Sequence, residues 1–250
     1  MRKIGLAAAY ALFMTLGLVG HPSDAHAVAA GLAGTLGIVP GLGHVAGGEP
    51  LEGLGWFATV VGLYAVPNSN VQQAGWDLWQ YSMYDAYRDA GPSINRVGHQ
   101  SVFENYVAAY NPVNIVDPIG GPIVGYGALV GKRKGLTPKG LVVYGFVGMG
   151  EEGLFRGFLF PAFSDLFSSK WAGAITSSAI FSLVHVTGGR ANLAGSALGQ
   201  RFVLGMLFSW QADRNKYDLR KNIFAHAWYD IFVDKGGRIT GGGLRVPIHF

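Results

Sequence analysis

Apolar residues dominate long stretches of this chain, and short segments rich in glycine, proline or basic residues separate them. In the C-terminal half the apolar segments cover residues 139–167, 171–186, 193–210 and 223–233. Segments that are apolar on all sides are typical of helices enclosed by a membrane or by a large core. The pattern therefore predicts an all-α fold, a polytopic integral membrane bundle of helices.

The N-terminus has the three parts of a bacterial secretory signal peptide. Arg2 and Lys3 precede an apolar run over residues 4–20, and the small residues Ala25 and Ala27 follow a polar stretch. The apolar run is also close to the minimum length of a membrane span, about 17–20 residues. Residues 1–27 are therefore predicted to be either a cleaved signal peptide or a first membrane helix.

Residues 28–130 are predicted to form an N-terminal membrane region that includes a hairpin and a broken helix. Residues 28–66 contain two apolar arms around a loop of glycines and prolines, which suits a helical hairpin. His44 and Glu49 lie in that loop and are predicted to be solvated or interfacial rather than ligands. Residues 112–130 are apolar but interrupted by glycine and proline, which predicts a broken membrane segment.

Between these two parts, residues 68–111 are less apolar and rich in aromatic side chains. Tyr and Trp favour the headgroup zone of a bilayer, so the segment is predicted to be an interfacial helix or a small lid. The aromatic and apolar face would carry Trp76, Trp79, Met83 and Tyr87, and the polar face would carry Asp77, Asp85, Arg88 and Asp89.

Composition agrees with a membrane protein and excludes several other classes. The chain is 50% hydrophobic but only 14% charged, whereas soluble domains carry about 25% charged residues. It has no cysteine, so a metal site would need His, Asp or Glu ligands. The net charge of +4 comes from basic residues in short loops, such as Lys132, Arg133 and Lys134. These are typical membrane-topology signals, and nucleic acid is not predicted as a partner.

Candidate catalytic residues occur as three pairs with helical spacing inside the apolar segments. They are Glu151-Glu152-x-x-x-Arg156, Phe181-x-x-x-His185 and His226-x-x-x-Asp230. In a helix, residues i and i+4 share a face, so Glu152 can pair with Arg156 while Glu151 points elsewhere. Buried ionisable groups need partners or a function, so we expect three helices to direct Glu151, His185, His226 and Asp230 into one cavity.

These three motifs resemble the signature of the CAAX protease and bacteriocin-processing family, which includes the type II CAAX prenyl endopeptidases. The family pattern E-E-x-x-x-R, F-x-x-x-H and H-x-x-x-N/D is written here as EEGLFR, FSLVH and HAWYD. The resemblance covers residues 139–234 within a predicted protease domain of residues 131–250. It implies that Glu151 is the general base, that His185 holds the attacking water, and that His226 with Asp230 stabilises the oxyanion. Glu152 and Arg156 would be a supporting ion pair.

Two features of this site leave alternatives open. Asp230 occupies a position where Asn would offer an amide donor, whereas an ionised Asp only accepts. It is therefore either protonated by its site or it orients His226. In addition, His185, His226 and Glu151 would make a plausible zinc set. The chain lacks the helical zinc motif H-E-x-x-H, so water activation without a metal and without a cofactor is preferred.

The function that these observations favour is that of an intramembrane endopeptidase with a peptide or membrane-protein substrate. The predicted location is the bacterial inner membrane, with several spans in the lipid bilayer. The alternative from another class is a non-catalytic membrane scaffold or bacteriocin-immunity-type protein of the same fold. A transporter is disfavoured because no inverted repeat is evident in the sequence.

Overall fold

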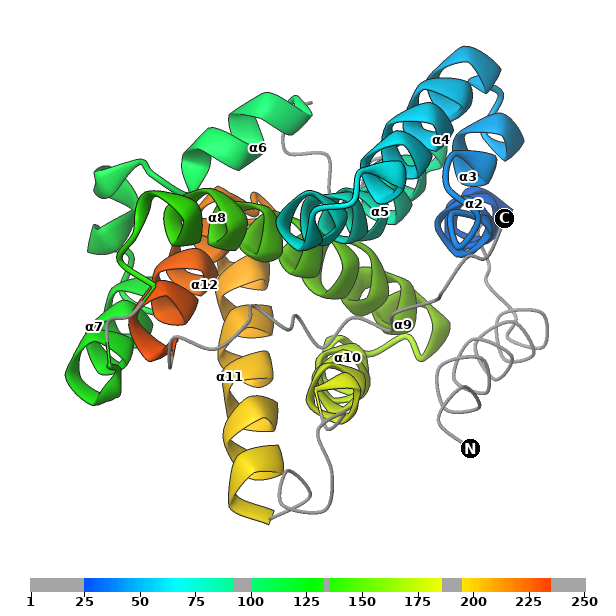
Figure 1. Ribbon diagram of the computed structural model, residues 1–250. Helices are drawn as coiled ribbons and strands as arrows, with labels where there is room; N and C mark the ends of the chain where they lie inside the picture. The colour runs from blue at the N-terminus through cyan, green and yellow to red at the C-terminus, as the bar shows by residue number, and fades with distance from the viewer. Residues whose placement is uncertain (1–24, 92–99, 133–134, 186–194, 235–250) are drawn as a thin grey trace.

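The computed structural model describes residues 25–91, 100–132, 135–185 and 195–234, and within these ranges every regular element is a helix (Figure 1). The predicted all-α class is therefore confirmed. The helices are α2 (Ala25–Leu36), α3 (Leu42–Ala46), α4 (Pro50–Ala65), α5 (Ser69–Ala90), α6 (Val102–Ala108), the 3-10 helix η1 (Pro112–Val116), α7 (Gly120–Val130), α8 (Pro138–Glu152), the π-helix η2 (Gly153–Leu159), α9 (Phe160–Leu166), α10 (Lys170–Val184), α11 (Gly195–Arg214) and α12 (Arg220–Val233).

Several helices begin where the sequence supplies a capping side chain. Asn68, Thr137 and Ser169 precede α5, α8 and α10, and each side chain accepts a hydrogen bond from a backbone N–H of the first turn. Ser101 and Glu104 form a reciprocal capping box at the start of α6. These bonds satisfy backbone donors that have no partner within the helix, which fixes where the helices start.

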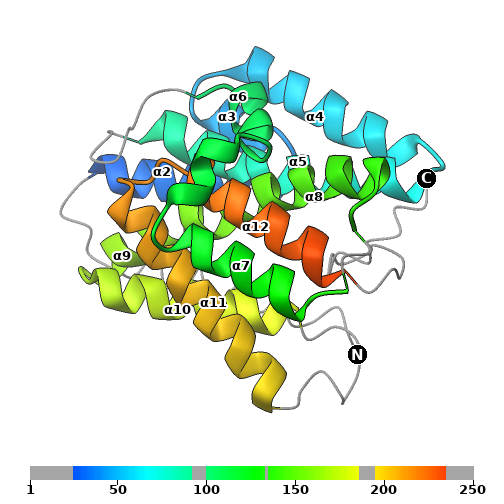
Figure 2. The same cartoon turned by 90° about the vertical axis from the view of Figure 1, so that its left-hand side faces the viewer.

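The first part of the segment predicted to lie at a membrane interface forms α5, which packs among other helices of the bundle. It packs against α2, α4, α8 and η2 (Figures 1 and 2). Asp77 and Asp85, expected on a polar face, are both buried, as are Tyr81 and Met83. The expected polar face is therefore wrong for Asp77 and Asp85, because neighbouring helices cover them, a tertiary effect that helical spacing alone does not show. The location of the segment at a membrane interface stays a prediction.

Three glycines allow α5 to approach α8 and η2 closely. A Cβ at Gly150 would lie 2.4 Å from the carbonyl oxygen of Asp77, and a Cβ at Gly157 would lie 2.3 Å from the ring of Tyr84. A Cβ at Gly153 would lie 3.1 Å from the ring of Tyr81, a less tight approach to the same helix. Gly150 precedes the Glu-Glu pair and the other two glycines follow it, so the lack of side chains at these positions lets α5 pack against the backbone on both sides of the pair.

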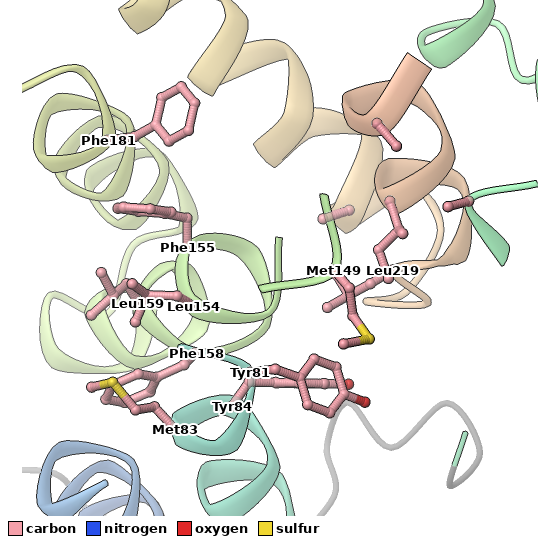
Figure 3. Packing of buried hydrophobic residues seen from close by; sticks show 14 of the residues in the cluster. Tyr81, Met83, Tyr84, Met149, Leu154, Phe155, Phe158, Leu159, Phe181 and Leu219 are labelled. Atoms are coloured by element: carbon pink, nitrogen blue, oxygen red, sulfur yellow. The ribbon is translucent and has the colours of Figure 1, made fainter. Parts of the chain in front are cut away.

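Helices α8, η2 and α9 follow one another without a break, and α10 packs against α9, η2 and α11. Helix α12 packs against α7 and α8, as Figure 2 shows. The main apolar core lies where α5 meets α8, η2 and α10, and Figure 3 shows Phe155 and Phe181 at one end of it and Tyr81 and Tyr84 at the other. The core therefore joins the N-terminal helices to those that carry the three motifs.

The remaining N-terminal predictions have mixed outcomes. Residues predicted to form a hairpin fold into α2, α3 and α4, but His44, expected to be solvated or interfacial, is buried. The predicted interruption within residues 112–130 separates η1 from α7, and Asp117 accepts hydrogen bonds there from the N–H groups of Ile119 and Gly120. The predicted signal peptide or first helix falls mostly on residues 1–24, which lie outside the described residues.

Among the described residues, no helix combines the length and the apolar character needed to cross a membrane.

Candidate functional site

The first motif lies where α8 passes into the π-helix η2. Glu151 and Glu152 are the last two residues of α8, and Arg156 lies within η2. A π-helix has a wider turn than an α-helix and often occurs at functional sites. Arg156 Nη1 donates to Glu152 Oε1 over 3.2 Å, and both side chains are fully buried. The predicted ion pair is present, and Glu151 points to a different set of partners.

Glu152 is the centre of a buried hydrogen-bond network. Besides Arg156, it accepts a bond from Asn222 Nδ2 at Oε2 over 3.1 Å and from His226 Nδ1 at Oε1 over 2.6 Å. All three partners are N–H donors, which matches an ionised carboxylate that can only accept. The bond from His226 Nδ1 fixes the orientation of that ring and directs its Nε2 away from Glu152.

Arg156 is held in place by aromatic rings as well as by Glu152. Its guanidinium carbon lies 4.5 Å from the ring centre of Phe181 and 5.1 Å from that of Phe208, and Nη2 donates to the carbonyl oxygen of Gly205. A guanidinium stacked on aromatic faces is stabilised by cation–π attraction. Arg156 therefore connects η2 with α10 and α11 in addition to balancing the charge of Glu152.

The second glutamate faces both histidines. Glu151 Oε2 lies 3.4 Å from His185 Nε2 and 3.5 Å from His226 Nε2, and Glu151 is 9% exposed. His185 follows the last residue of α10, and its Nδ1 lies 2.6 Å from the carbonyl oxygen of Phe181. A carbonyl oxygen only accepts, so Nδ1 of this ring carries a proton and donates it. The Nε2 atoms of both rings are therefore directed to Glu151.

Asp230 meets the same nitrogen of His226 from the next turn of α12. Its Oδ2 lies 3.5 Å from His226 Nε2, and its side chain is 24% exposed, more than that of Glu151. The structure thus brings together all six residues named from the sequence, with Glu151 and Asp230 on one side of His226 and Glu152 on the other. Asp230 and His185, whose side chains are exposed to about the same degree, are the members of the cluster that solvent can reach.

The cluster combines the groups that hydrolysis of a carbonyl compound requires. Glu151 is a carboxylate placed beside two imidazole nitrogens, and such a group can accept a proton from water. His226 is oriented by a buried carboxylate, and an oriented imidazole can donate to a developing oxyanion. Burial strengthens these electrostatic interactions because little water competes with them.

Sequence reasoning did not identify Asn222 and Phe208 as parts of this cluster. Asn222 donates to Glu152 and to the carbonyl oxygen of Phe208, and the ring of Phe208 stacks on His226 with centres 5.2 Å apart. A signal for Asn222 was present, because it precedes His226 by four residues and therefore shares its helix face. Phe208 had no such signal, since it lies on α11, within an ordinary apolar segment.

Comparison with known proteins gives one match, which lies in the C-terminal half. Residues 134–232 match a family model described as Type II CAAX prenyl endopeptidase Rce1-like. No curated protein and no solved structure matches the chain. The matched range contains all three motifs, and the family consists of membrane-embedded proteases. Residues 134–232, which carry the three motifs, are therefore similar to the type II CAAX prenyl endopeptidase family.

Proposed function

We propose that this protein is an intramembrane endopeptidase in which Glu151 activates a water molecule for attack on a peptide bond. The observation that carries the proposal is the convergence of three motifs on one carboxylate oxygen. Glu151 Oε2 lies 3.4 Å from His185 Nε2 and 3.5 Å from His226 Nε2, although Glu151 lies in α8, His185 at the end of α10 and His226 in α12.

In the proposed reaction Glu151 takes a proton from water as the water oxygen bonds to the carbonyl carbon of the substrate. His185 Nε2 lies beside Glu151 and helps to hold the water. His226 donates from Nε2 to the oxyanion while its Nδ1–H continues to donate to Glu152. When the C–N bond breaks, the proton on Glu151 passes to the leaving amine, so atoms and charges balance.

The position of Asp230 supports one of its two predicted roles. Its Oδ2 lies near His226 Nε2, the atom that faces the reacting centre. An ionised carboxylate at this place cannot donate to an oxyanion, but it can orient the imidazole that does. We therefore assign donation to His226 and orientation to Asp230, at the more exposed edge of the site.

Large apolar side chains on the outer surface support a location in a lipid bilayer. Leu51 on α4, Leu129 on α7, and Trp171 on α10 are among the most exposed side chains of this kind. Contact with lipid would remove these side chains from water. With the signal-like N-terminus, this supports the bacterial inner membrane as the location and a peptide or membrane-protein segment as the substrate.

The test is a peptide-library cleavage assay on the full-length protein, purified in detergent or nanodiscs. Glu151→Gln keeps the shape of the side chain but removes the base, and we expect a loss of about 10²- to 10⁴-fold in cleavage rate. Glu104→Gln is the matched control, because Gln still completes the capping box at the start of α6. Equal cleavage by wild type and Glu151→Gln would exclude the proposed base.

The same assay separates the two alternatives that the sequence leaves open. A zinc mechanism using His185, His226 and Glu151 predicts that a chelator abolishes cleavage and that zinc restores it. The metal-free mechanism predicts that cleavage continues with the chelator present. A non-catalytic scaffold or immunity protein predicts no cleavage of any peptide, with partner binding unchanged by Glu151→Gln.

A further inference from the structure

A second cluster of ionisable side chains lies outside the family match, where α3, α4 and α5 meet. His44 comes from α3, Glu52 from the first turn of α4, and Asp85 and Asp89 from successive turns of α5. One ligand atom from each of these four residues lies within 4.8 Å of every other. Among the residues that the structure describes, this is the one set of His, Asp and Glu side chains that meets this criterion.

His44 is the member that distinguishes this cluster from an ordinary acidic patch. It is 2% exposed and stacks on Trp56, with ring centres 5.9 Å apart. Its Nε2 lies 3.4 Å from Asp85 Oδ2, and its buried Nδ1 has no hydrogen-bond partner among the described residues. The distance of 3.4 Å exceeds that of an ordinary N–H···O bond. It equals the separation of about 3.4 Å between two ligand atoms on a tetrahedral metal ion.

Two donors orient the Asp85 carboxylate toward His44. Arg88 donates to Asp85 Oδ1 and to Asp89 Oδ1, so one guanidinium holds the two carboxylates side by side. The indole N–H of Trp56 donates to Asp85 Oδ2 over 3.2 Å. Such outer contacts fix ligand orientation in known metal sites, and their presence makes this cluster preorganised.

Three carboxylates gather at this cluster, and Arg88 pairs with two of them, Asp85 and Asp89. Asp85 is buried, whereas Glu52 is exposed. A divalent cation held by these side chains would add positive charge beside the buried carboxylate, which is the more costly of them to keep ionised.

We propose that His44, Glu52, Asp85 and Asp89 bind one first-row divalent cation, such as zinc or manganese, at a structural site separate from the protease cluster. One imidazole with several carboxylates suits these ions better than calcium or magnesium, which prefer oxygen ligands alone. Glu52 is exposed and Asp89 is half-buried, so the ion can enter from solvent. Binding would connect α3 and α4 to α5, the helix that packs directly on α8 and η2.

The experiment is a metal-binding measurement on the full-length protein in detergent. After treatment with a chelator and its removal, the protein is titrated with zinc chloride or manganese chloride alone, and bound metal is counted by mass spectrometry. We expect one equivalent in the wild type. We expect none in Glu52→Gln, which alters an exposed side chain and should leave the fold intact, and none in His44→Ala. Metal should also raise the melting temperature of wild type but not of Glu52→Gln.

Asp213→Asn is the control, because Asp213 is a carboxylate on α11 that pairs with Lys170 at the surface. The Asp213→Asn variant should still bind one metal ion per protein molecule. Retention of metal by both Glu52→Gln and His44→Ala would overturn the proposal, as would the absence of bound metal in wild type, which would leave only an ion-pair network. If the bound metal ion were lost in His185→Ala but kept in Glu52→Gln, it would belong to the protease cluster. That result would also contradict the proposed site.

Discussion

Two clusters of this protein are built from the same three kinds of side chain. In each, an arginine pairs with a carboxylate about one turn earlier in the same helix, and a histidine from a different helix meets that carboxylate. The N-terminal cluster contains Asp85, Arg88 and His44, and the C-terminal cluster contains Glu152, Arg156 and His226.

The two clusters differ in how completely the protein encloses them. The side chains of Glu152 and Arg156 are fully buried, whereas the side chain of Arg88 is 14% exposed and Glu52 beside it is exposed. The C-terminal cluster also has a further carboxylate, Glu151, facing its histidine. Full enclosure suits a site where charges must act without competing water, whereas partial exposure suits the exchange of an ion with solvent.

The largest expected difference is in the free energy of unfolding that is lost when each of the two arginines, Arg156 and Arg88, is removed. Arg156→Ala leaves Glu152 buried without its cation, and we expect a loss of about 3–5 kcal/mol in the free energy of unfolding. Arg88→Ala should cost less, about 1.5–3 kcal/mol, because Asp85 keeps the hydrogen bond from Trp56 and water can reach the partly exposed Asp89. Thermal and denaturant unfolding of the two variants in the same detergent measures the difference. Equal losses would mean that the enclosure of the C-terminal cluster has no energetic consequence.

Removal of Asn222, the uncharged side chain that donates to Glu152, should have the next largest effect on stability. Asn222→Leu removes the hydrogen bonds to Glu152 Oε2 and to the carbonyl oxygen of Phe208 at similar volume. Hydrogen bonds to charged groups contribute about 1.5–3 kcal/mol, so we expect a loss of that size. Because Glu152 orients His226, cleavage should fall even at temperatures where the variant remains folded. Unchanged cleavage by the folded variant would show that Asn222 acts on stability alone.

The C-terminal cluster could be anticipated from the sequence because its residues stand out locally. Glu151, Glu152 and Arg156 are charged residues within an apolar segment, and helical spacing already pairs Glu152 with Arg156. What spacing could not supply was the partner of each histidine nitrogen. The contact between His226 Nδ1 and Glu152 joins residues that lie far apart in the chain, so only the folded structure shows it.

The N-terminal cluster was not anticipated because its residues lie in segments that look solvated. His44 is in a loop of glycines and prolines, and Asp85 is in a helix with many polar side chains. Both are buried because α3, α4 and α5 pack around them. A polar residue in a polar segment gives no local sign of burial, so the polar face predicted for α5 and the solvated loop predicted at His44 were both wrong.

Helix α5 links the two clusters, and Gly150 sets how closely it approaches. Gly150→Ala would place a Cβ 2.4 Å from the backbone of Asp77, and we expect a loss of about 1–3 kcal/mol from overpacking, with reduced cleavage because Glu151 follows directly. Gly55→Ala on α4 is the matched control, since its Cβ would meet no atom within 4 Å. There the change should be neutral or stabilising by up to about 1 kcal/mol. Similar unfolding curves for the two variants would contradict the close packing.

The smallest expected effect on stability is for Trp56, the uncharged side chain that donates to Asp85 in the N-terminal cluster. Trp56→Phe keeps an aromatic ring beside His44 but removes the N–H that bonds to Asp85 Oδ2. One such bond contributes about 0.5–1.5 kcal/mol, and Asp85 retains the charged partner Arg88. Cleavage should be unchanged, whereas the proposed metal affinity should weaken because the ligand is less firmly oriented, by about 10- to 100-fold. If Trp56→Phe lowered cleavage as much as Asn222→Leu, the two clusters would be one functional unit rather than a reaction site and a separate anchor of the N-terminal helices.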